Sequence, residues 1–338
     1  MARSGVGSAP YQEFDARITE AAIAWLNEHG QSQAKPWVLF VSYPSPHPPF
    51  LVPEQLYALH PEREVRLPGR FRPEERARHP AIEHLRQIMG TREITDEAAV
   101  RRIAAGYLGL VAHLDRQIGQ VLAALDDLGL AETTRVLYAS DHGDLYGEHG
   151  VLGKSCMYEG AIGTPLLMCG PGIPAGRVVN QIASHVDLFP TIVASVGAEL
   201  IGEDRDLPGT SLWPAFQARE QERIGFAEYH ATGAKAGVFM LRAQELKLVY
   251  HVGMRAQLFD LAADPDEARD LIEHGEGAEQ AKAIEAKLRA ICNPEEVDAR
   301  AKADQRAKAA FWGGKEAIAK EGSLVFTPPP GHSAEIEH

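Results

Sequence analysis

The stretch from residue 95 to residue 140 constrains the fold of this chain more than any other part of the sequence. Thr95-Asp96-Glu97 supplies a helix N-cap and an acidic first turn, and apolar residues then recur at three- and four-residue steps as far as Leu128. Gly129 ends this long amphipathic helix, and the apolar run 135–140 follows as a β-strand. A long helix that leads into a strand predicts an α/β fold with helices covering a sheet.

The flanking segments repeat this alternation of helix and strand. Residues 13–28 predict a helix, and residues 36–42 predict a buried strand because their apolar run is continuous. A short strand at 164–169 precedes a helix at 186–196. The order predicts a doubly wound, largely parallel central sheet flanked by helices. Residues 43–80, rich in Pro, Arg and His, predict a long surface loop of the kind that often carries function.

The sequence changes character after Pro214, where short apolar runs alternate with turn residues. These runs predict a small antiparallel sheet, followed by an Ala- and Glu-rich helix. The four expected strands span residues 223–229, 237–242, 246–251 and 257–261, and the helix spans 278–291. We therefore expect an α/β domain at 1–214, a small C-terminal α+β subdomain at 215–295, and a helical, Pro-rich tail at 296–338.

The composition excludes several classes of protein. A chain of 338 residues with 45% hydrophobic content can bury a large core, and a net charge of −13 argues against a nucleic-acid partner. The three widely spaced cysteines form neither a disulfide framework nor a zinc ribbon, which fits a reducing compartment. The start lacks the apolar core of a signal peptide, and no apolar run is long enough to span a membrane. These features predict a cytoplasmic protein without membrane contacts.

Asp141 and His142 stand directly after the strand at 135–140, followed by a Gly-rich loop. Ligands of open α/β sheets bind beyond the carboxyl ends of strands, and both side-chain types are metal ligands. The alternative, left open by the residues alone, is an acid that caps a turn beside a surface histidine.

Two basic residues are candidates for binding an anion. Lys154 follows three glycines, but the loop is not a phosphate-binding Walker A motif because Glu148 occupies the position of its first glycine. A lysine in such a loop can still provide a point charge for a tetrahedral anion, and a solvated surface lysine is the alternative. His47 lies between prolines that fix the backbone, so its ring is either aimed at a site or part of a structural proline turn.

Other polar residues carry weaker signals. The run from Ser184 to Asp187 contains Ser, His and Asp, but Asp187 is better explained as a cap of the following helix. Glu148, His149, Tyr229 and His230 are further candidates for the pocket, although each is also typical of a surface or a sheet edge.

Taken together, these segments resemble the sulfatase family of the alkaline-phosphatase-like superfamily. The resemblance rests on family-like order and spacing of several motifs between about Asp15 and Asp270. The motifs are Ser-Pro-His-Pro-Pro at 45–49, the helix end at 114–122, the run 138–154, Thr-Pro-Leu-Leu-Met-Cys-Gly-Pro-Gly at 164–172, Val-Asp-Leu-Phe-Pro-Thr at 186–191, and Leu-Phe-Asp-Leu-Ala-Ala-Asp-Pro-Asp-Glu at 258–267.

The resemblance implies an alkaline-phosphatase-like fold and metal-assisted hydrolysis of small sulfate esters. Asp141 and His142 match metal ligands of the family, while Lys154 and His47 match basic residues that hold the sulfate and its leaving oxygen. His230 is expected to contribute to substrate binding. The implied cofactor is a divalent ion, with Ca²⁺ expected and Mg²⁺ or Mn²⁺ left open.

The sequence also departs from the family pattern. It contains neither the early strand ending in paired acids nor the Cys/Ser-x-Pro/Ala-x-Arg motif that supplies the family's nucleophile. We expect a sulfatase without its N-terminal segment, which a missing N-terminal half or a homo-oligomer could complement. A phosphonate monoester or phosphodiester hydrolase, and a noncatalytic anion-binding homologue, are the alternatives left open.

Overall fold

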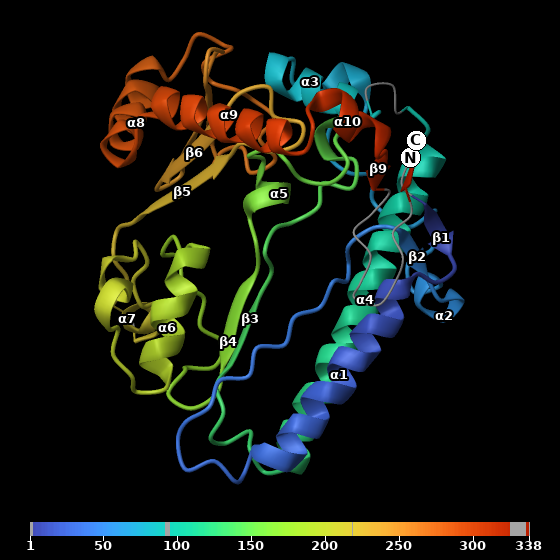
Figure 1. Ribbon diagram of the computed structural model, residues 1–338, viewed down its shortest axis with the longest axis vertical. Coiled ribbons are helices and arrows are strands. Elements are labelled where there is room, and N and C mark those ends of the chain that lie inside the picture. Colours follow the sequence, from blue (N-terminus) through green and yellow to red (C-terminus); the bar gives the residue numbers. More distant parts are fainter. Residues whose placement is uncertain (1–2, 92–94, 218, 325–335, 338) are drawn as a thin grey trace.

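Two long helices form one side of the molecule. The computed structural model describes residues 3–91, 95–217, 219–324 and 336–337, and in it α1 (Pro10–His29) and α4 (Glu97–Asp127) lie side by side (Figure 1). They run in the same direction, because Asp15 lies beside His113 and Leu26 packs with Leu125. The sequence predicts both helices from the spacing of their apolar residues, and the structure confirms these predictions.

The N-cap of α4 is the one that the sequence predicts. The Asp96 carboxylate accepts hydrogen bonds from the backbone N–H groups of Ala98 and Ala99, at 2.9 and 3.3 Å. It thereby satisfies two of the amide groups that the start of a helix leaves without partners.

The segment 36–42, predicted to be a buried strand, is extended but pairs with no strand among the described residues. Its side chains alternate: Trp37 and Leu39 pack against the core of α1 and α4, whereas Val38 and Phe40 are 55% and 86% exposed. The prediction of a buried strand is therefore wrong, because an apolar run becomes a buried strand only where neighbouring strands pair with it and cover both of its faces.

The strands of the α/β part form two short pairs. Strands β1 (Ser4–Val6) and β2 (Phe50–Val52) pair in parallel, and β3 (Val136–Ala139) pairs antiparallel with β4 (Leu166–Cys169). Among the described strands, the expected largely parallel central sheet is thus represented by one parallel and one antiparallel pair. The segment 36–42 and β3 do not pair with each other but line a common cavity.

The C-terminal subdomain follows the sequence prediction closely. Strands β5 (Ile224–Tyr229), β6 (Val238–Ala243), β7 (Leu246–His251) and β8 (Gln257–Asp260) form an antiparallel sheet in chain order. Helix α8 (Ala278–Ile291) packs Ile284 and Leu288 onto one face of this sheet.

The other face of the sheet contacts the loop that follows β3. Leu145 and Val151 of that loop share a buried cluster with Val249 and Phe259 of the sheet. This packing fixes the loop against the C-terminal subdomain and so positions the candidate site.

The remaining elements are short, apart from one polar helix near the C-terminus. They are α2 (Glu54–Tyr57), α3 (Pro80–Ile88), α5 (Glu159–Ile162), α6 (Leu188–Ser195), α7 (Trp213–Phe216), α9 (Pro294–Phe311), α10 (Lys315–Lys320), β9 (Ser323–Leu324), β10 (Ile336–Glu337), and 3₁₀ turns at Pro73–Glu75, Glu148–Gly150, His185–Asp187 and Gly202–Asp206. None of the described helices is both long and apolar enough to cross a membrane. The Pro-rich run 328–330 of the expected tail lies outside the described residues, and the proposed domain boundaries stay predictions.

Candidate functional site

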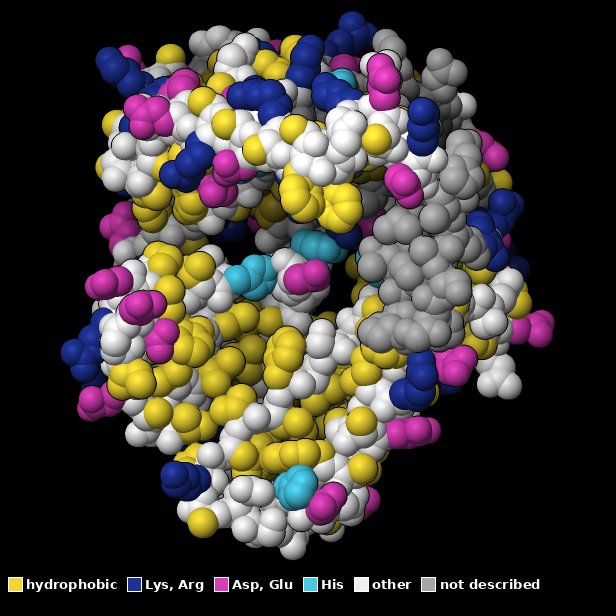
Figure 2. All heavy atoms as spheres, in the orientation of Figure 1, with side chains coloured by type: hydrophobic (Ala, Val, Ile, Leu, Met, Phe, Trp, Pro, Cys, Tyr) yellow, Lys and Arg dark blue, Asp and Glu magenta, His cyan; other side chains and the backbone are white. Residues whose placement is uncertain are grey.

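A cavity of about 1950 Å³ separates the α1–α4 layer from β3 and β4. Figure 2 shows hydrophobic side chains gathered in a hollow of the surface, with histidine side chains at its border. The segment 33–48, one face of α4 and the end of β3 with its loop provide much of its lining. His47, Asp141, His142 and Lys154 all line this cavity, so the fold brings together four of the five residues to which the family resemblance gives a role.

Asp141 and His142 form the turn at the end of β3. The Asp141 side chain is 83% exposed, and its carboxylate accepts a hydrogen bond from the His142 backbone N–H at 2.8 Å. Gly143 follows because there is no room for a side chain: a Cβ atom there would lie 2.1 Å from the carbonyl oxygen of Gly160. The Asp-His-Gly sequence therefore satisfies a close backbone approach as well as presenting two ligands.

The two side chains fit part of a divalent-metal site. The His142 Nδ1–H donates to the Gly143 carbonyl at 2.9 Å, which leaves Nε2 as the free ligand atom, 3.3 Å from Asp141 Oδ2. An imidazole held by a carbonyl in this way is the usual arrangement of a metal-binding histidine. Among the described residues, however, no group of three or more His, Cys, Asp or Glu is placed to hold a metal ion. Asp141 and His142 thus provide two ligands of a larger set.

Asp144, which the sequence analysis missed, closes the loop between the two ligands and Lys154. Its Oδ1 accepts hydrogen bonds from the backbone N–H groups of Tyr146, at 2.8 Å, and Gly153, at 3.2 Å. Burial raises the pKa of this carboxyl, against the lowering effects of those two bonds and of the nearby Lys154 and His47. The sequence feature that could have identified Asp144 is its position as an acid three residues after Asp141.

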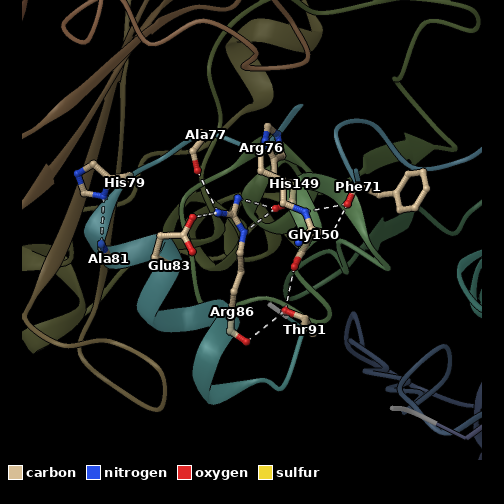
Figure 3. A network of polar contacts seen from close by, with 10 residues as sticks. All are labelled: Phe71, Arg76, Ala77, His79, Ala81, Glu83, Arg86, Thr91, His149 and Gly150. Carbon is tan, nitrogen blue, oxygen red and sulfur yellow. Dashed lines mark hydrogen bonds and ion pairs between the residues drawn. The ribbon is translucent and has the colours of Figure 1, made fainter. Parts of the chain in front are cut away.

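The tip of the same loop is anchored to α3 and to the segments around it. Figure 3 shows the fully buried Arg86 guanidinium reaching the loop, where Nε and Nη2 donate to the His149 carbonyl at 2.9 and 2.6 Å. The Thr91 hydroxyl donates to the Gly150 carbonyl at 2.8 Å. His149 is buried with its ring stacked on Tyr158 at 3.9 Å, so it is neither a surface nor a sheet-edge residue.

His47 presents one ring nitrogen to the cavity. Its Nδ1–H donates to the Pro48 carbonyl at 2.8 Å, which leaves Nε2 free. Burial lowers the pKa of the imidazole, and the neighbouring Lys154 and His142 lower it further, while Asp144 and the bond to Pro48 oppose them. The charge on His47 is therefore coupled to the charges of three neighbouring side chains, those of Lys154, Asp144 and His142.

No cysteine of the chain is an obvious nucleophile for this site. Cys156, two residues after Lys154, is buried, and burial raises the pKa of its thiol to about 12. A protonated, buried thiol is inert. All three cysteines are free of disulfide bonds.

His230 lies apart from the other four predicted residues. It follows β5, and its ring packs edge-on against Phe239 at 5.3 Å, where its nitrogens are buried without hydrogen-bond partners. It does not line the cavity, because the β5 end places it against the C-terminal sheet. Its substrate-binding role stays a prediction without support from its position. Tyr229, beside it, donates to the Ser155 hydroxyl at 2.9 Å.

The Ser184–Asp187 stretch is structural, as predicted. Asp187 Oδ2 accepts from the Ser184 backbone N–H at 2.8 Å, and both carboxylate oxygens bind the Arg223 guanidinium. Asp187 is therefore the third residue of the turn His185–Asp187, where its side chain bonds back to the N-cap residue Ser184, and it is not itself the N-cap of that turn. His185 has an unforeseen role: its ring nitrogen donates to the Ser140 carbonyl at 2.7 Å, next to Asp141.

Comparisons with known proteins agree with this architecture. The family model described as "Sulfatase" matches residues 3–198, and the model described as "N-sulphoglucosamine sulphohydrolase, C-terminal" matches residues 147–293. The first covers more than half of the chain and contains His47, Asp141, His142 and Lys154.

Curated relatives include Arylsulfatase K from several vertebrates. The Xenopus laevis protein is 28% identical over 88% of this chain and 59% of its own length, and the Danio rerio protein is 31% identical over 76% of this chain and 52% of its own length. The Homo sapiens protein is 28% identical over 93% of this chain and 62% of its own length. The chain therefore spans between 52% and 62% of the length of these three relatives.

Solved structures share the fold. A phosphonate monoester hydrolase from Silicibacter pomeroyi has a TM-score of 0.68 and 25% identity, covering 82% of this chain and 58% of that one. A protein solved with its substrate D-glucosamine-2-N,6-O-disulfate has a TM-score of 0.69 and 22% identity, covering 85% and 70%. The fold is thus alkaline-phosphatase-like, and members of this family generally depend on a divalent metal. On these matches, the chain belongs to the sulfatase family.

Proposed function

We propose that the protein hydrolyses sulfate esters and that this chain carries the half of the active site that binds the anion and part of the metal. The observation that carries the proposal is the convergence of His47, Lys154, Asp141 and His142 on one cavity. A lysine, an imidazole and two metal ligands suit an ester with a tetrahedral anionic centre.

Each residue has a separate task in this proposal. Lys154 binds the sulfate oxygens as a point charge. His47 carries a proton on Nε2 beside the leaving oxygen when its ring is the imidazolium, since its Nδ1–H is engaged by the Pro48 carbonyl. Burial and the neighbouring Lys154 lower the pKa of the free imidazole, and a bound anion opposes them because it favours the protonated ring and raises that pKa.

Asp141 and His142 would hold a divalent ion, for which we propose Ca²⁺. When bound, the ion supplies Lewis-acid charge that stabilises negative charge on the ester oxygens. A carboxylate oxygen suits a hard cation, and Mg²⁺ or Mn²⁺ are the competing ions.

A paired assay tests the reaction class. We expect an aryl sulfate to be turned over faster than the matched aryl phosphonate, with His47→Ala and Lys154→Ala slower on the sulfate. Faster phosphonate turnover would replace this proposal by phosphonate monoester hydrolysis, the candidate favoured by the 25% identical structural relative. Sulfate binding without turnover of either substrate would indicate a noncatalytic anion-binding protein.

We further propose a reducing, cytoplasmic location, which the three free cysteines support. For the polypeptide partner we propose a second copy of this chain; the exposed segment 36–42, which pairs with no strand among the described residues, supports such a contact. Light scattering of the purified chain tests this choice, because a second copy would double the mass.

A further inference from the structure

Helix α1 holds the segment that carries His47 through one stripe of side chains. Thr19 bonds to the Tyr43 hydroxyl at 3.0 Å, and Asp15 accepts from the Ser45 hydroxyl at 2.5 Å. One turn earlier, the Tyr11 ring meets the His47 ring edge-on, with 5.5 Å between their centroids. Steps of four residues along the helix thus match steps of two along the extended segment, which runs in the opposite direction.

Asp15 is the central contact of this stripe and the most unusual residue in it. The carboxylate is fully buried, and its Oδ1 has no hydrogen-bond partner among the described residues. Its Oδ2 lies 3.4 Å from Nε2 of His113 on α4, whose side chain is 11% exposed. An acid is rarely kept in such a place, because a buried carboxylate with an unfilled oxygen is costly.

The bond from Ser45 gives this buried acid a consequence for the site. Ser45 is itself buried, stands two residues before His47, and is joined to it through Pro46, whose ring restricts the backbone. A displacement of Ser45 is therefore transmitted to the His47 ring, whose direction also depends on its edge contact with Tyr11 and on its own bond to Pro48.

We propose that Asp15 is a positioning residue, whose buried carboxylate fixes Ser45 and thereby aims the His47 imidazole into the cavity beside Lys154. The inference rests on the proposed role of His47 in binding the sulfate ester. Asp15 itself touches neither the cavity nor an anion bound there, since it does not line the cavity.

The experiment reads the His47 ring directly, so that it does not depend on turnover. The imidazole C–H signals of His47 are followed by NMR at one pH in the full chain, with His47→Ala used to assign them. Ser45→Ala removes the bond with little change in volume, and Asp15→Ala removes the acceptor. Asp15→Asn keeps an acceptor oxygen for the Ser45 hydroxyl. Thr19→Val is the matched control, because it removes buried hydrogen bonds one turn further along α1.

We expect Ser45→Ala and Asp15→Ala to shift the His47 signals, Asp15→Asn to restore most of the shift, and Thr19→Val to leave them in place. Affinity for inorganic sulfate, measured by calorimetry, is expected to fall about threefold to tenfold in Ser45→Ala, the equivalent of one lost hydrogen bond. Unshifted His47 signals in Ser45→Ala would overturn the proposal, as would equal shifts in Thr19→Val.

The outcome separates this inference from the proposed function. If His47→Ala and Lys154→Ala leave sulfate affinity unchanged, the anion site fails, whereas the NMR comparison still decides whether Asp15 orients the ring. Should Asp15→Ala fail to fold, Ser45→Ala carries the test alone.

Discussion

Arg86 directs two of its N–H groups at a single carbonyl oxygen, that of His149, across 63 residues of sequence. The same guanidinium also donates to the Ala77 carbonyl, at 3.0 Å, and to Glu83. A fully buried cation is thus hydrogen-bonded by backbone carbonyl oxygens at the tip of the loop that bears the candidate site, and the Glu83 carboxylate provides its counter-charge.

Arg86→Lys should destabilise the fold by about 3 kcal/mol. A lysine ammonium has fewer N–H donors than the arginine guanidinium, so buried carbonyl oxygens would lose their hydrogen-bond partners. Chemical denaturation followed by circular dichroism measures the change in the free energy of unfolding. Glu83→Gln is the control: its side chain is 42% exposed and keeps an acceptor for Arg86, so a loss below about 1 kcal/mol is expected. Equal stability of Arg86→Lys and the unmodified protein would contradict the anchoring role.

Lys154→Ala should weaken the binding of inorganic sulfate by about tenfold or more, since a charge-assisted contact contributes about 1.5–3 kcal/mol. Isothermal titration calorimetry gives the affinity, and unfolding curves should coincide with those of the unmodified chain because Lys154 faces the cavity. Lys282→Ala, on the exposed side of α8, removes the same charge from the whole protein and should leave the affinity unchanged. An equal loss in both variants would mean that only net charge matters.

Asp141→Ala should abolish retention of a divalent ion, because it removes the carboxylate from a pair that no third His, Cys, Asp or Glu completes among the described residues. Calcium titration by calorimetry and metal analysis after gel filtration measure the effect. Asp304→Ala, an exposed acid of α9, is the control for loss of negative charge. Calcium binding that survives Asp141→Ala would return this residue to the role of a turn cap.

Stability should fall as the pH drops below about 6.5, in part through His251. Burial, together with His79, whose ring centroid lies 4.3 Å away, and Arg255, lowers the pKa of this imidazole to about 3. The unfolded chain, with a pKa near 6.5, takes up the proton first, so stability is full above about pH 6.5 and is lost towards pH 3, by about 1.4 kcal/mol per pH unit for this group.

His251→Gln should therefore flatten the pH dependence of the unfolding free energy between pH 6.5 and 5. Denaturation curves at several pH values give the slope. His274→Gln, at an exposed histidine, should keep the slope of the unmodified protein. A slope that is the same in all three proteins would show that His251 does not couple protonation to folding.

The sequence predicts most helices and the C-terminal sheet because their signals are local. The period of α4, its Asp96 cap and the alternation along β5 to β8 each depend on residues close together in the chain. The segment 36–42 shows the limit of such reasoning. Its apolar run predicts an extended backbone correctly, but burial depends on partners that no local pattern specifies.

The candidate site divides in the same way. His47, Asp141, His142 and Lys154 follow strand ends or fixed turns, so their positions could be predicted. Asp15, Arg86 and His185 could not, because each acts on a residue between 30 and 63 positions away through one hydrogen bond or a pair of them. The substrate-binding role of His230 stays a prediction, since a histidine after a strand says nothing about which edge of which sheet it joins.

The stripe that joins α1 to the His47 segment also limits how this region can change length. Four helical residues advance about 6 Å, and two extended residues advance about 6.6 Å. The side chains of α1 and those of the His47 segment therefore stay opposite one another for only a few steps. Inserting or deleting one residue between Tyr43 and His47 would turn the side chains beyond that point away from the helix, so the contacts of Thr19, Asp15 and Tyr11 could not all be kept. Homologous chains should therefore vary in residue identity along this segment far more readily than in its length.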